Sequence, residues 1–567
     1  MYNFCLTTMK NAYQKYAGLL LSLILLLSGC SNKKNQQHSI PHLTESGGVT
    51  RLIVDDNPYL VLGGELHNSS SSSLAYMKKI WPVLDSSSAN TILAAVEWSL
   101  LEPEEGHLDF SLVDGLIDQA RHHNKRLILL WFGAWKNGQS HYCPGWVKKD
   151  FIRFPRAKTE AGKSLEIISP FSDEILKADK KAYTSLLSHI NGYDSVNRTV
   201  IMVQIENEVG ILGAQRDYSE GARKSFNSEV PGDLMLYLEN HKADLYPGLL
   251  EEWSKNGTKT KGTWEEVFGR SSLTNEIFMA WRYADYIGKM AAAGKKEYPL
   301  PVFVNAWIVQ PQDKQPGDYP SGGPQANMLD VWKAGAPDVD LFCPDIYLPD
   351  FEFICNAYTR NSNTLFIPES RAGEQGAAQL VYAIGRHKAI GYSPFGIESV
   401  IEPAATDPVV KIYKNLNEMA PVILKAQQED RITAVMLRSG MSQDWIEAGN
   451  YSLHVQMIDS VSNNPNNSAW GYLLVITEKP DEFTLLGKNV QITFSPVTPG
   501  PSVAAILSAE EGRYKNGVWK PRRRLNGDAI MVNYNLGELA ALNQTGTGLK
   551  FTGYDRLIQR VKLYRYP

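Results

Sequence analysis

Hydrophobic runs of strand length recur along residues 49–425, and stretches with helical spacing separate them. Between the second and third runs, Leu112, Val113, Leu116, Ile117 and Ala120 keep the spacing of one buried helix face. Near-continuous apolar strands are typical of parallel sheets covered by helices on both faces. Eight such runs predict an α/β domain of the (β/α)8 TIM barrel type over residues 49–425. The runs are PYLVLGGEL, ANTILAAVEW, KRLILLWFG, TVIMVQIENE, LPVFVNAW, VDLFCPDIY, TLFIPES and GYSPFGIES.

An open, doubly wound sheet is the alternative for alternating strands and helices. Such a sheet normally carries a glycine-rich phosphate turn after a strand. No run in this sequence is followed by one. The barrel is therefore the favoured prediction.

The pattern changes after about residue 430. Segments such as YSLHVQMI, GYLLVIT, NVQITF and AIMVNYNL are short and β-rich, with Asn, Gly and Pro turns between them. This pattern predicts a C-terminal β-sandwich domain over residues 430–567. Bracing of the barrel is the default role for this domain, and sugar binding is the alternative.

The N-terminus has the pattern of an export signal. Lys10 and Lys15 precede LLLSLILLLSG, an apolar run that is too short for a stable membrane span. The run ends in Leu-Ser-Gly-Cys30, which resembles a bacterial lipobox. This likeness implies a lipoprotein signal peptide over residues 1–29, lipidation of Cys30 and a tether over residues 30–48. The protein would then be lipid-anchored in the bacterial cell envelope, periplasmic or surface-exposed; an ordinary cleaved secretory signal is the alternative.

Composition limits the partners. A formal net charge of -4 provides no basic field of the kind that nucleic acid binding requires. The one dense basic cluster, Lys-Pro-Arg-Arg-Arg at residues 520–524, is interpreted as a solvated loop. The five cysteines lack the close spacing of metal or redox motifs, so no metal site is expected. Cys343 and Cys355 could form a disulfide, but two buried thiols are favoured. The oligomeric state is not predicted.

Polar and aromatic side chains stand at the ends of nearly all the predicted strands. The active site of a barrel lies at the carboxyl ends of its strands, because the loops there vary without disturbing the core. Acids and aromatics at so many ends predict a catalytic site. These residues are Glu65, His67, Glu97, Trp98, Trp131, Trp135, Asn207, Glu208, Asn305, Trp307, Asp345, Tyr347, Glu369 and Glu398.

Glycoside cleavage needs two carboxyl groups, one protonated and one ionised. In a retaining enzyme they stand about 5–5.5 Å apart. Glu208 ends the fourth predicted strand and Glu369 the seventh, and these strands face each other across the barrel mouth. Glu206 is the alternative to Glu208, but two strand residues place it about 6.6 Å deeper. The alternatives to Glu369 are Glu374, Glu398 and Glu402.

Three sequence blocks carry a family likeness. VEWSLLEPEEGHLDFS is followed in order by CPGWV and by VQIENEVG. Together they resemble glycoside hydrolase family 35, the β-galactosidase family of clan A, over about residues 50–400. The resemblance implies that Glu208 is the acid/base, that Glu369 is the nucleophile and that Asn207 binds the sugar 2-hydroxyl.

The chain also departs from the family pattern. Ser370 and Arg371 follow Glu369, where the family usually has an aromatic residue, and GGELHNSS differs from the common first block. The sequence therefore resembles a divergent bacterial lipoprotein branch with a C-terminal β-rich domain.

The other strand-end side chains are candidate substrate ligands. Tyr347 is expected to donate a hydrogen bond to Glu369, with Arg371 as a cationic neighbour. Trp98 or Trp307 would cover a sugar ring, with barrel packing as the alternative. No metal or organic cofactor is required by this chemistry. The residues expected to bind hydroxyls are Glu65, His67, Glu97, Asn207 and Asn305.

The sequence thus predicts a retaining, exo-acting β-galactosidase that removes terminal galactose from an oligo- or polysaccharide. One alternative is another clan A glycosidase, such as a β-glucosidase, an arabinosidase or an endo-glycanase. A non-catalytic glycan-binding surface lipoprotein is the alternative from a different class. The presence of both candidate carboxyls and of the Asn-Glu pair argues against it.

Overall fold

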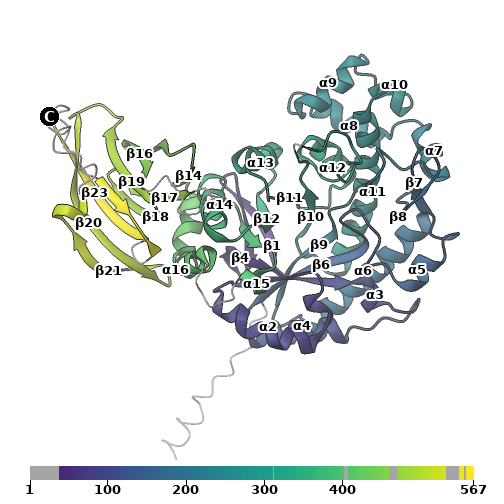
Figure 1. Ribbon diagram of the computed structural model, residues 1–567, viewed down its shortest axis with the longest axis horizontal. Helices are drawn as coiled ribbons and strands as arrows, with labels where there is room; N and C mark the ends of the chain where they lie inside the picture. Colours follow the sequence, from purple (N-terminus) through teal and green to yellow (C-terminus); the bar gives the residue numbers. More distant parts are fainter. Residues whose placement is uncertain (1–37, 311, 401–406, 459–468, 531–547, 555–556) are drawn as a thin grey trace, which may run out of the picture. The chain divides into compact units, whose positions relative to one another are not determined.

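The computed structural model describes residues 38–310, 312–400, 407–458, 469–530, 548–554 and 557–567 (Figure 1). The predicted signal peptide, Cys30 and the first part of the predicted tether lie outside these residues. Within the described ranges, no helix combines the length and the apolar character needed to cross a membrane.

Eight parallel strands form the predicted barrel. Their order is β11-β10-β9-β6-β5-β4-β13-β12, and β11 and β12 meet at a parallel bridge between Ile346 and Ser370. All residues of β4 and β9 are buried, because helices cover the outside and side chains fill the inside. The strands are β4 (Val61–Glu65), β5 (Thr91–Glu97), β6 (Arg126–Lys136), β9 (Val200–Asn207), β10 (Val302–Trp307), β11 (Leu341–Asp345), β12 (Phe366–Ser370) and β13 (Gly391–Pro394).

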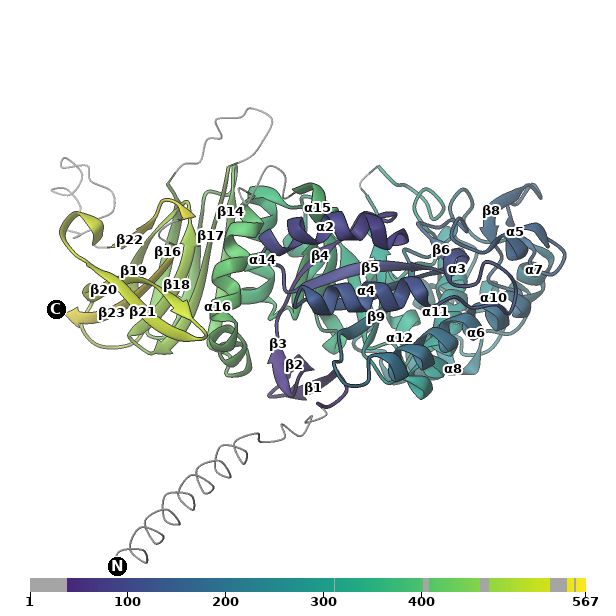
Figure 2. The same ribbon diagram turned by 90° about the horizontal axis from the view of Figure 1, so that it is seen from below.

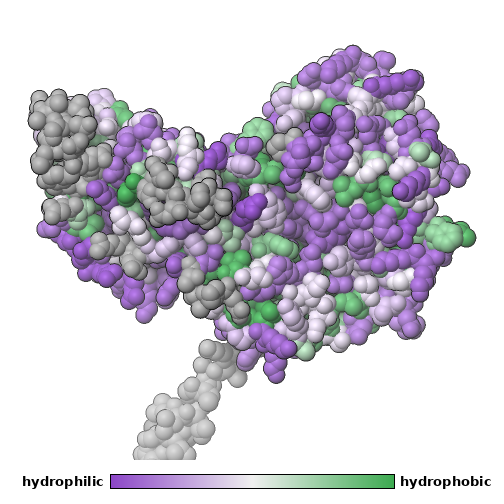
Figure 3. Space-filling view, in the orientation of Figure 1, coloured by the Kyte–Doolittle hydropathy of each residue, from purple (hydrophilic) through white to green (hydrophobic). Residues whose placement is uncertain are grey.

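A helix follows each barrel strand and turns its apolar side inward. In α4, Val113, Leu116, Ile117 and Ala120 of the predicted face are buried. Figure 2 shows α2 and α4 on the outside of the strands, and the barrel surface in Figure 3 is mainly hydrophilic. The main helices are α2 (Leu74–Ser86), α4 (Ser111–His122), α6 (Asp173–Tyr193), α11 (Ser272–Glu297), α12 (Leu329–Gly335), α13 (Phe351–Tyr358), α14 (Gly373–Arg386) and α16 (Pro408–Gln428).

Smaller elements lie in the loops of the barrel. The longest insertion follows β9 and consists of four short helices. These are α7 (Glu220–Phe226), α8 (Gly232–Asn240), α9 (Pro247–Lys255) and α10 (Trp264–Phe268); the others are α3 (Trp98–Leu101), α5 (Gly145–Lys149), β7 (Arg156–Lys158), β8 (Ser164–Ile168) and α15 (Ile397–Val400).

The predicted tether extends too far along the chain. Residues 42–46 already form a strand, which Gly47 and Gly48 connect to the next one with φ of 63° and 72°. Glycine adopts these left-handed angles without a steric penalty. Leu52 and Val54 are buried in the same hydrophobic cluster as the barrel strands, so this small sheet belongs to the folded barrel. Its strands are β1 (His42–Ser46), β2 (Val49–Val54) and β3 (Asn57–Tyr59).

The C-terminal region forms two antiparallel sheets, β14-β17-β18-β23-β20-β21 and β15-β16-β19-β22. Val435 and Leu473 from the first sheet share one core with Leu453 and Ile492 from the second, which confirms the sandwich. Residues 529–530 of the predicted AIMVNYNL strand lie in a short 3-10 helix, and residues 531–536 are outside the described ranges. The strands are β14 (Ile432–Arg438), β15 (Gln443–Ala448), β16 (Tyr451–Met457), β17 (Trp470–Lys479), β18 (Glu482–Lys488), β19 (Val490–Pro496), β20 (Val503–Lys515), β21 (Val518–Leu525), β22 (Gly548–Phe551) and β23 (Ile558–Tyr566).

The six-stranded sheet is buried on both faces where it meets α14. Along β14, Val435 and Leu437 face the sandwich core, whereas Ala434 and Met436 belong to the barrel cluster. At Gly385 of α14, an added Cβ would lie 2.5 Å from the Ala434 Cβ. This close approach requires glycine and supports the bracing role of the sandwich.

The basic cluster at residues 520–524 is part of a strand, not a solvated loop. It lies in β21 and pairs with β20. Residues 520–524 are all exposed, so no hydrophobic alternation marks the strand in the sequence. Cys343 and Cys355 are buried free thiols, as favoured above.

Candidate active site

Four carboxyl groups meet at the carboxyl ends of the barrel strands. One oxygen each of Glu208, Asp345 and Glu369 lies within 4.8 Å of the others, and burial and the nearby charge of Glu369 raise the pKa of Glu65 well above its usual range. They come from the ends of β9, β11, β12 and β4. Each side chain belongs to a residue that is at most 7% exposed. So many carboxyls in one buried place cannot all be ionised, so some must hold protons.

Hydrogen-bond donors surround Glu369. The Tyr347 hydroxyl donates to Glu369 Oε2 at 3.0 Å, as predicted, and Asn207 Nδ2 donates to Oε1 at 3.4 Å. Such donors favour the ionised carboxylate. Arg371 is not the expected cationic neighbour, because its Nε donates to the Tyr347 carbonyl oxygen at 3.0 Å. This arginine follows the end of β12 and is already exposed.

The surroundings of Glu208 favour the protonated form. Burial and the negative charge of Glu369 raise the pKa of Glu208 to about 8. A carboxyl that is neutral near neutral pH is what a general acid requires. The backbone of Glu208 has a φ of 43°, a left-handed value that is uncommon for a residue other than glycine and typical of functional sites.

Asn305 connects Asp345 to Glu208. The Asn305 Nδ2 donates to Asp345 Oδ2 at 2.7 Å, and its Oδ1 accepts the backbone N–H of Glu208 at 2.9 Å. Burial and the charges of Glu369 and Glu208 raise the pKa of Asp345. Both ends of the Asn305 amide are therefore used within the protein. This residue positions Glu208, and its predicted contact with a sugar hydroxyl stays a prediction, because the amide keeps a second N–H and a second lone pair.

Lys136 is a functional residue that the sequence did not reveal. It is 6% exposed, and its Nζ donates to Asn207 Oδ1 at 2.9 Å. Its positive charge lowers the pKa of both Glu65 and Glu208. The apolar run KRLILLWFG ends three residues before Lys136, so the sequence pattern assigns Lys136 to a turn after the strand. In the structure β6 continues to this residue and brings it into the mouth of the barrel.

Glu206, the alternative to Glu208, makes hydrogen bonds that hold the backbone of a neighbouring strand. Its carboxylate accepts the backbone N–H groups of Ala134 and Trp135 at 2.9 and 2.7 Å. It thereby fixes the end of β6. This placement agrees with the expectation that Glu206 holds its neighbours.

The described alternatives to Glu369 lie elsewhere. Glu374 pairs with Lys488 of the sandwich. Glu398 accepts the Ser70 hydroxyl at 2.6 Å and the His67 backbone N–H at 3.0 Å. Glu402 is outside the described residues.

The described contacts of His67 and Glu97 are with residues other than the four clustered carboxyl groups. The exposed His67 ring has its Nε2 2.8 Å from Ser399 Oγ. Glu97 is half-buried, and burial raises its pKa despite a hydrogen bond with Ser99. The contacts of both residues are outside the four-carboxyl group, so their binding roles remain predictions.

The prediction that Trp98 covers a sugar ring is wrong. It is 0% exposed, and its Nε1 donates to Glu102 Oε2 at 2.8 Å. As the first residue of α3 it turns into the barrel wall and packs against Trp131 and Trp146. Trp307 at the end of β10 is half-buried and stays a candidate.

The same three carboxylates are also close enough to hold a metal ion, and they are the one such group among the described residues. A hard cation needs the oxygen lone pairs free. Here Asn305 donates to Asp345, and Tyr347 and Asn207 donate to Glu369. These donors fit carboxyl groups that exchange protons better than carboxylates that ligate a metal.

Two family models match the chain. Residues 51–246 match "Glycosyl hydrolases family 35", a range that includes Asn207 and Glu208 but not Glu369. Residues 409–537 match "Domain of unknown function (DUF5597)". That match begins inside α16, the helix that leads into the sandwich. No curated protein sequence matches the chain.

Several solved structures are similar to part of this chain. The β-galactosidase from Bacillus circulans sp. alkalophilus is 16% identical over 64% of this chain and 57% of its own, with a TM-score of 0.44. The β-galactosidase from Marinomonas ef1 is 12% identical over 65% and 62%, with a TM-score of 0.42. The catalytic domain of β-amylase from Paenibacillus polymyxa is 12% identical over 60% and 93%, with a TM-score of 0.43. The chain thus spans about six-tenths of the length of these β-galactosidases, and the likeness adds no argument about substrate. Over residues 51–246, the part of the barrel that carries Asn207 and Glu208, the chain is thus similar to the glycosyl hydrolases of family 35.

Proposed function

We propose that the protein is a retaining, exo-acting β-galactosidase with Glu208 as acid/base and Glu369 as nucleophile. One observation carries the proposal: oxygens of these two carboxylates lie within 4.8 Å of each other. Retaining glycosidases hold their carboxyls about 5–5.5 Å apart, whereas inverting enzymes need about 6.5–9.5 Å to admit a water.

The contrasting surroundings of the two groups support these roles. In the first step Glu369 attacks the anomeric carbon, the bond to the leaving oxygen breaks, and Glu208 gives that oxygen its proton. Glu369 is now a neutral ester, so the charge that raised the pKa of Glu208 is gone. Glu208 therefore stays ionised and takes a proton from water, which attacks the anomeric carbon and releases Glu369.

The remaining carboxyl oxygens suit a terminal sugar. Among the described residues, no donor reaches either Glu65 oxygen or Asp345 Oδ1, although all three are buried. A buried acceptor without a donor costs free energy, and sugar hydroxyls would supply the donors. An enclosed group of this kind favours the end of a glycan over the middle of a chain.

Hydrolysis of a nitrophenyl β-galactoside and of an unactivated galactoside tests the proposal. Glu369→Gln should abolish turnover of both, and Glu208→Gln should slow the unactivated substrate by about 10²–10⁴-fold or more. Glu374→Gln, the matched control, should leave turnover unchanged. Proton NMR should show the β-anomer forming first. Full activity of either catalytic variant, or the α-anomer first, would reject the mechanism, and a panel of aryl glycosides tests the choice of sugar.

We also propose that Cys30 is lipidated and holds the enzyme in the bacterial cell envelope. The lipobox-like sequence supports this proposal. Mass spectrometry of the N-terminal peptide from envelope fractions should find an acylated Cys30. An unmodified N-terminus after residue 29, or at another position, would contradict it.

A further inference from the structure

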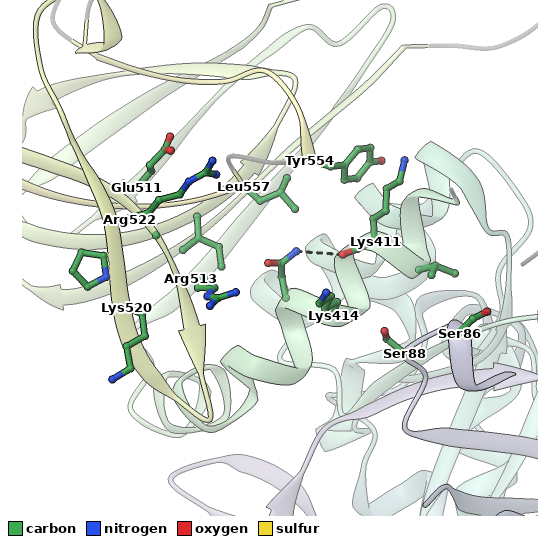
Figure 4. A pocket seen from close by; sticks show the side chains of 15 residues that line it. Ser86, Ser88, Lys411, Lys414, Glu511, Arg513, Lys520, Arg522, Tyr554 and Leu557 are labelled. Carbon is green, nitrogen blue, oxygen red and sulfur yellow. Dashed lines mark hydrogen bonds between the residues drawn. The ribbon is translucent and has the colours of Figure 1, made fainter. Parts of the chain in front are cut away.

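A second concave site lies on the outer wall of the barrel. A cavity of about 910 Å³ opens between α16 and strands β20 and β21 of the sandwich (Figure 4). Tyr413 on the inner side of α16 donates to the backbone of the barrel strands, whereas Lys411 and Lys414 line the cavity. The site is thus separate from the four carboxyls at the strand ends.

Cationic side chains dominate this cavity, which we call the basic groove. Lys411 and Lys414 of α16 face Arg513 of β20 and Arg522 of β21, and Lys520 lies at its edge with its ammonium group pointing away in Figure 4. Among the residues that the structure describes, none of the five forms an ion pair. The protein as a whole has a net charge of -4. Gathering like charges in a cleft raises the local potential and attracts anions.

Glu511 is the one carboxylate among the residues that line the groove. Glu511 is 3% exposed and pairs with Arg523, whose Nε lies 2.8 Å from Glu511 Oε1. At the other end of the groove, two lysines lie close to the Tyr554 ring. Lys411 Nζ is 4.8 Å and Lys488 Nζ is 4.0 Å from the centroid of the ring. The groove therefore offers a net positive wall to an incoming ligand.

Size and lining narrow the class of anion. A volume of about 910 Å³ is near the top of the range of roughly 300–1,000 Å³ for ligand sites, which is too large for a single inorganic ion. Single-stranded nucleic acids need aromatic faces for their bases, and the Tyr554 ring is already flanked by lysines. Ser86, Ser88 and Asn415 add neutral groups that suit sugar hydroxyls.

We propose that the basic groove binds an acidic polysaccharide, a chain whose sugars carry carboxylate or sulfate groups. The proposal goes beyond hydrolysis at the carboxyl cluster and concerns a separate binding event. A chain held here would raise the effective concentration of its branches near the enzyme. That consequence rests on the proposed function, but binding to the groove does not.

Binding to defined polyanions tests the groove directly. We would titrate the full chain carrying Glu369→Gln with polygalacturonate, dextran sulfate and neutral dextran at about 50 and 300 mM salt. The expected result is binding of one or both acidic glycans, weaker at high salt, with none for dextran. The two acidic probes distinguish carboxylate from sulfate recognition.

Variants assign the binding to the groove. Lys414→Gln/Arg513→Gln should weaken binding about three- to tenfold, the range expected for two partly exposed ionic contacts. Lys177→Gln/Lys181→Gln on α6 removes the same charge elsewhere and should have no effect. Melting temperatures check folding, and the single variants Lys414→Gln and Arg513→Gln serve if the double variant unfolds. Nitrophenyl galactoside hydrolysis by the groove variants of the active enzyme should be unchanged, which separates this proposal from the catalytic one.

Three outcomes would overturn the proposal. The first is no binding of either acidic glycan, and the second is equal binding by the groove and control variants. The third is binding of duplex DNA or of phosphatidylglycerol vesicles as tight as that of the acidic glycans at about 150 mM salt, which would assign the groove to another polyanion.

Discussion

Replacing Glu369 by Gln should lower the pKa of Glu208 by about two units. Burial and the charge of Glu369 raise this pKa from its ordinary 4.5 to about 8. Two unit charges 4.8 Å apart interact by about 3.5 kcal/mol at an effective dielectric constant of about 20, which corresponds to about 2.5 pKa units. Loss of this interaction should therefore bring the pKa of Glu208 from about 8 to about 5.5–6.

Carbon-13 NMR of glutamate-labelled protein measures this pKa directly, and Glu208→Gln assigns the signal. In the active enzyme the same ionisation should appear as the alkaline limb of kcat/KM near pH 8, because Glu208 must carry its proton to act as an acid. Glu374→Gln removes an equivalent charge that pairs with Lys488 and should leave the pKa of Glu208 in place. An unchanged pKa in Glu369→Gln would refute the electrostatic coupling on which the assignment of roles depends.

Three further outcomes are expected. Glu65→Gln should raise the melting temperature at pH 8 and change it little at pH 4. The pKa of Glu65 is raised in the folded protein, so ionisation of Glu65 destabilises the fold; this cost is absent below the unfolded-state pKa and grows as the pH rises towards the folded-state pKa. Equal shifts in melting temperature at both pH values would contradict this reasoning. Trp98→Ala should cost about 3–5 kcal/mol in urea unfolding, whereas Trp307→Ala should mainly raise KM; the reverse pattern would restore Trp98 as the sugar platform. Dialysis against EDTA should leave kcat unchanged, since the proposed steps move only protons and the sugar; a loss restored by Ca²⁺ or Mg²⁺ would assign a metal to Glu208, Asp345 and Glu369.

The sequence predicts the barrel well because its strands are buried on both faces. Such strands appear as apolar runs, and the carboxyl end of each run identifies the side chains at the barrel mouth. The sequence pattern did not predict the strands at residues 42–46 and 520–524. Both strands have few buried side chains, so neither shows a hydrophobic pattern in the sequence. Their pairing partners define them.

The candidate site could be predicted only in part. Glu208, Glu369 and Tyr347 follow from strand ends and from the family likeness. Trp98 and Trp307 look alike in sequence, yet the first begins a helix and turns inward. The role of Asn305 depends on Asp345 and on the Glu208 backbone, which are distant in the chain. Contacts of this kind arise from the register between strands and leave no local pattern.

The double burial of the six-stranded sheet makes the sandwich inseparable from catalysis. Helix α14 begins four residues after Glu369, and its far side packs on β14, where Gly385 allows Ala434 to approach closely. A chain shortened at residue 429 would expose apolar side chains of this helix to water. The two domains should therefore melt in one cooperative transition, and a transplanted barrel would need a replacement for the lost sheet before it could hold its nucleophile in place.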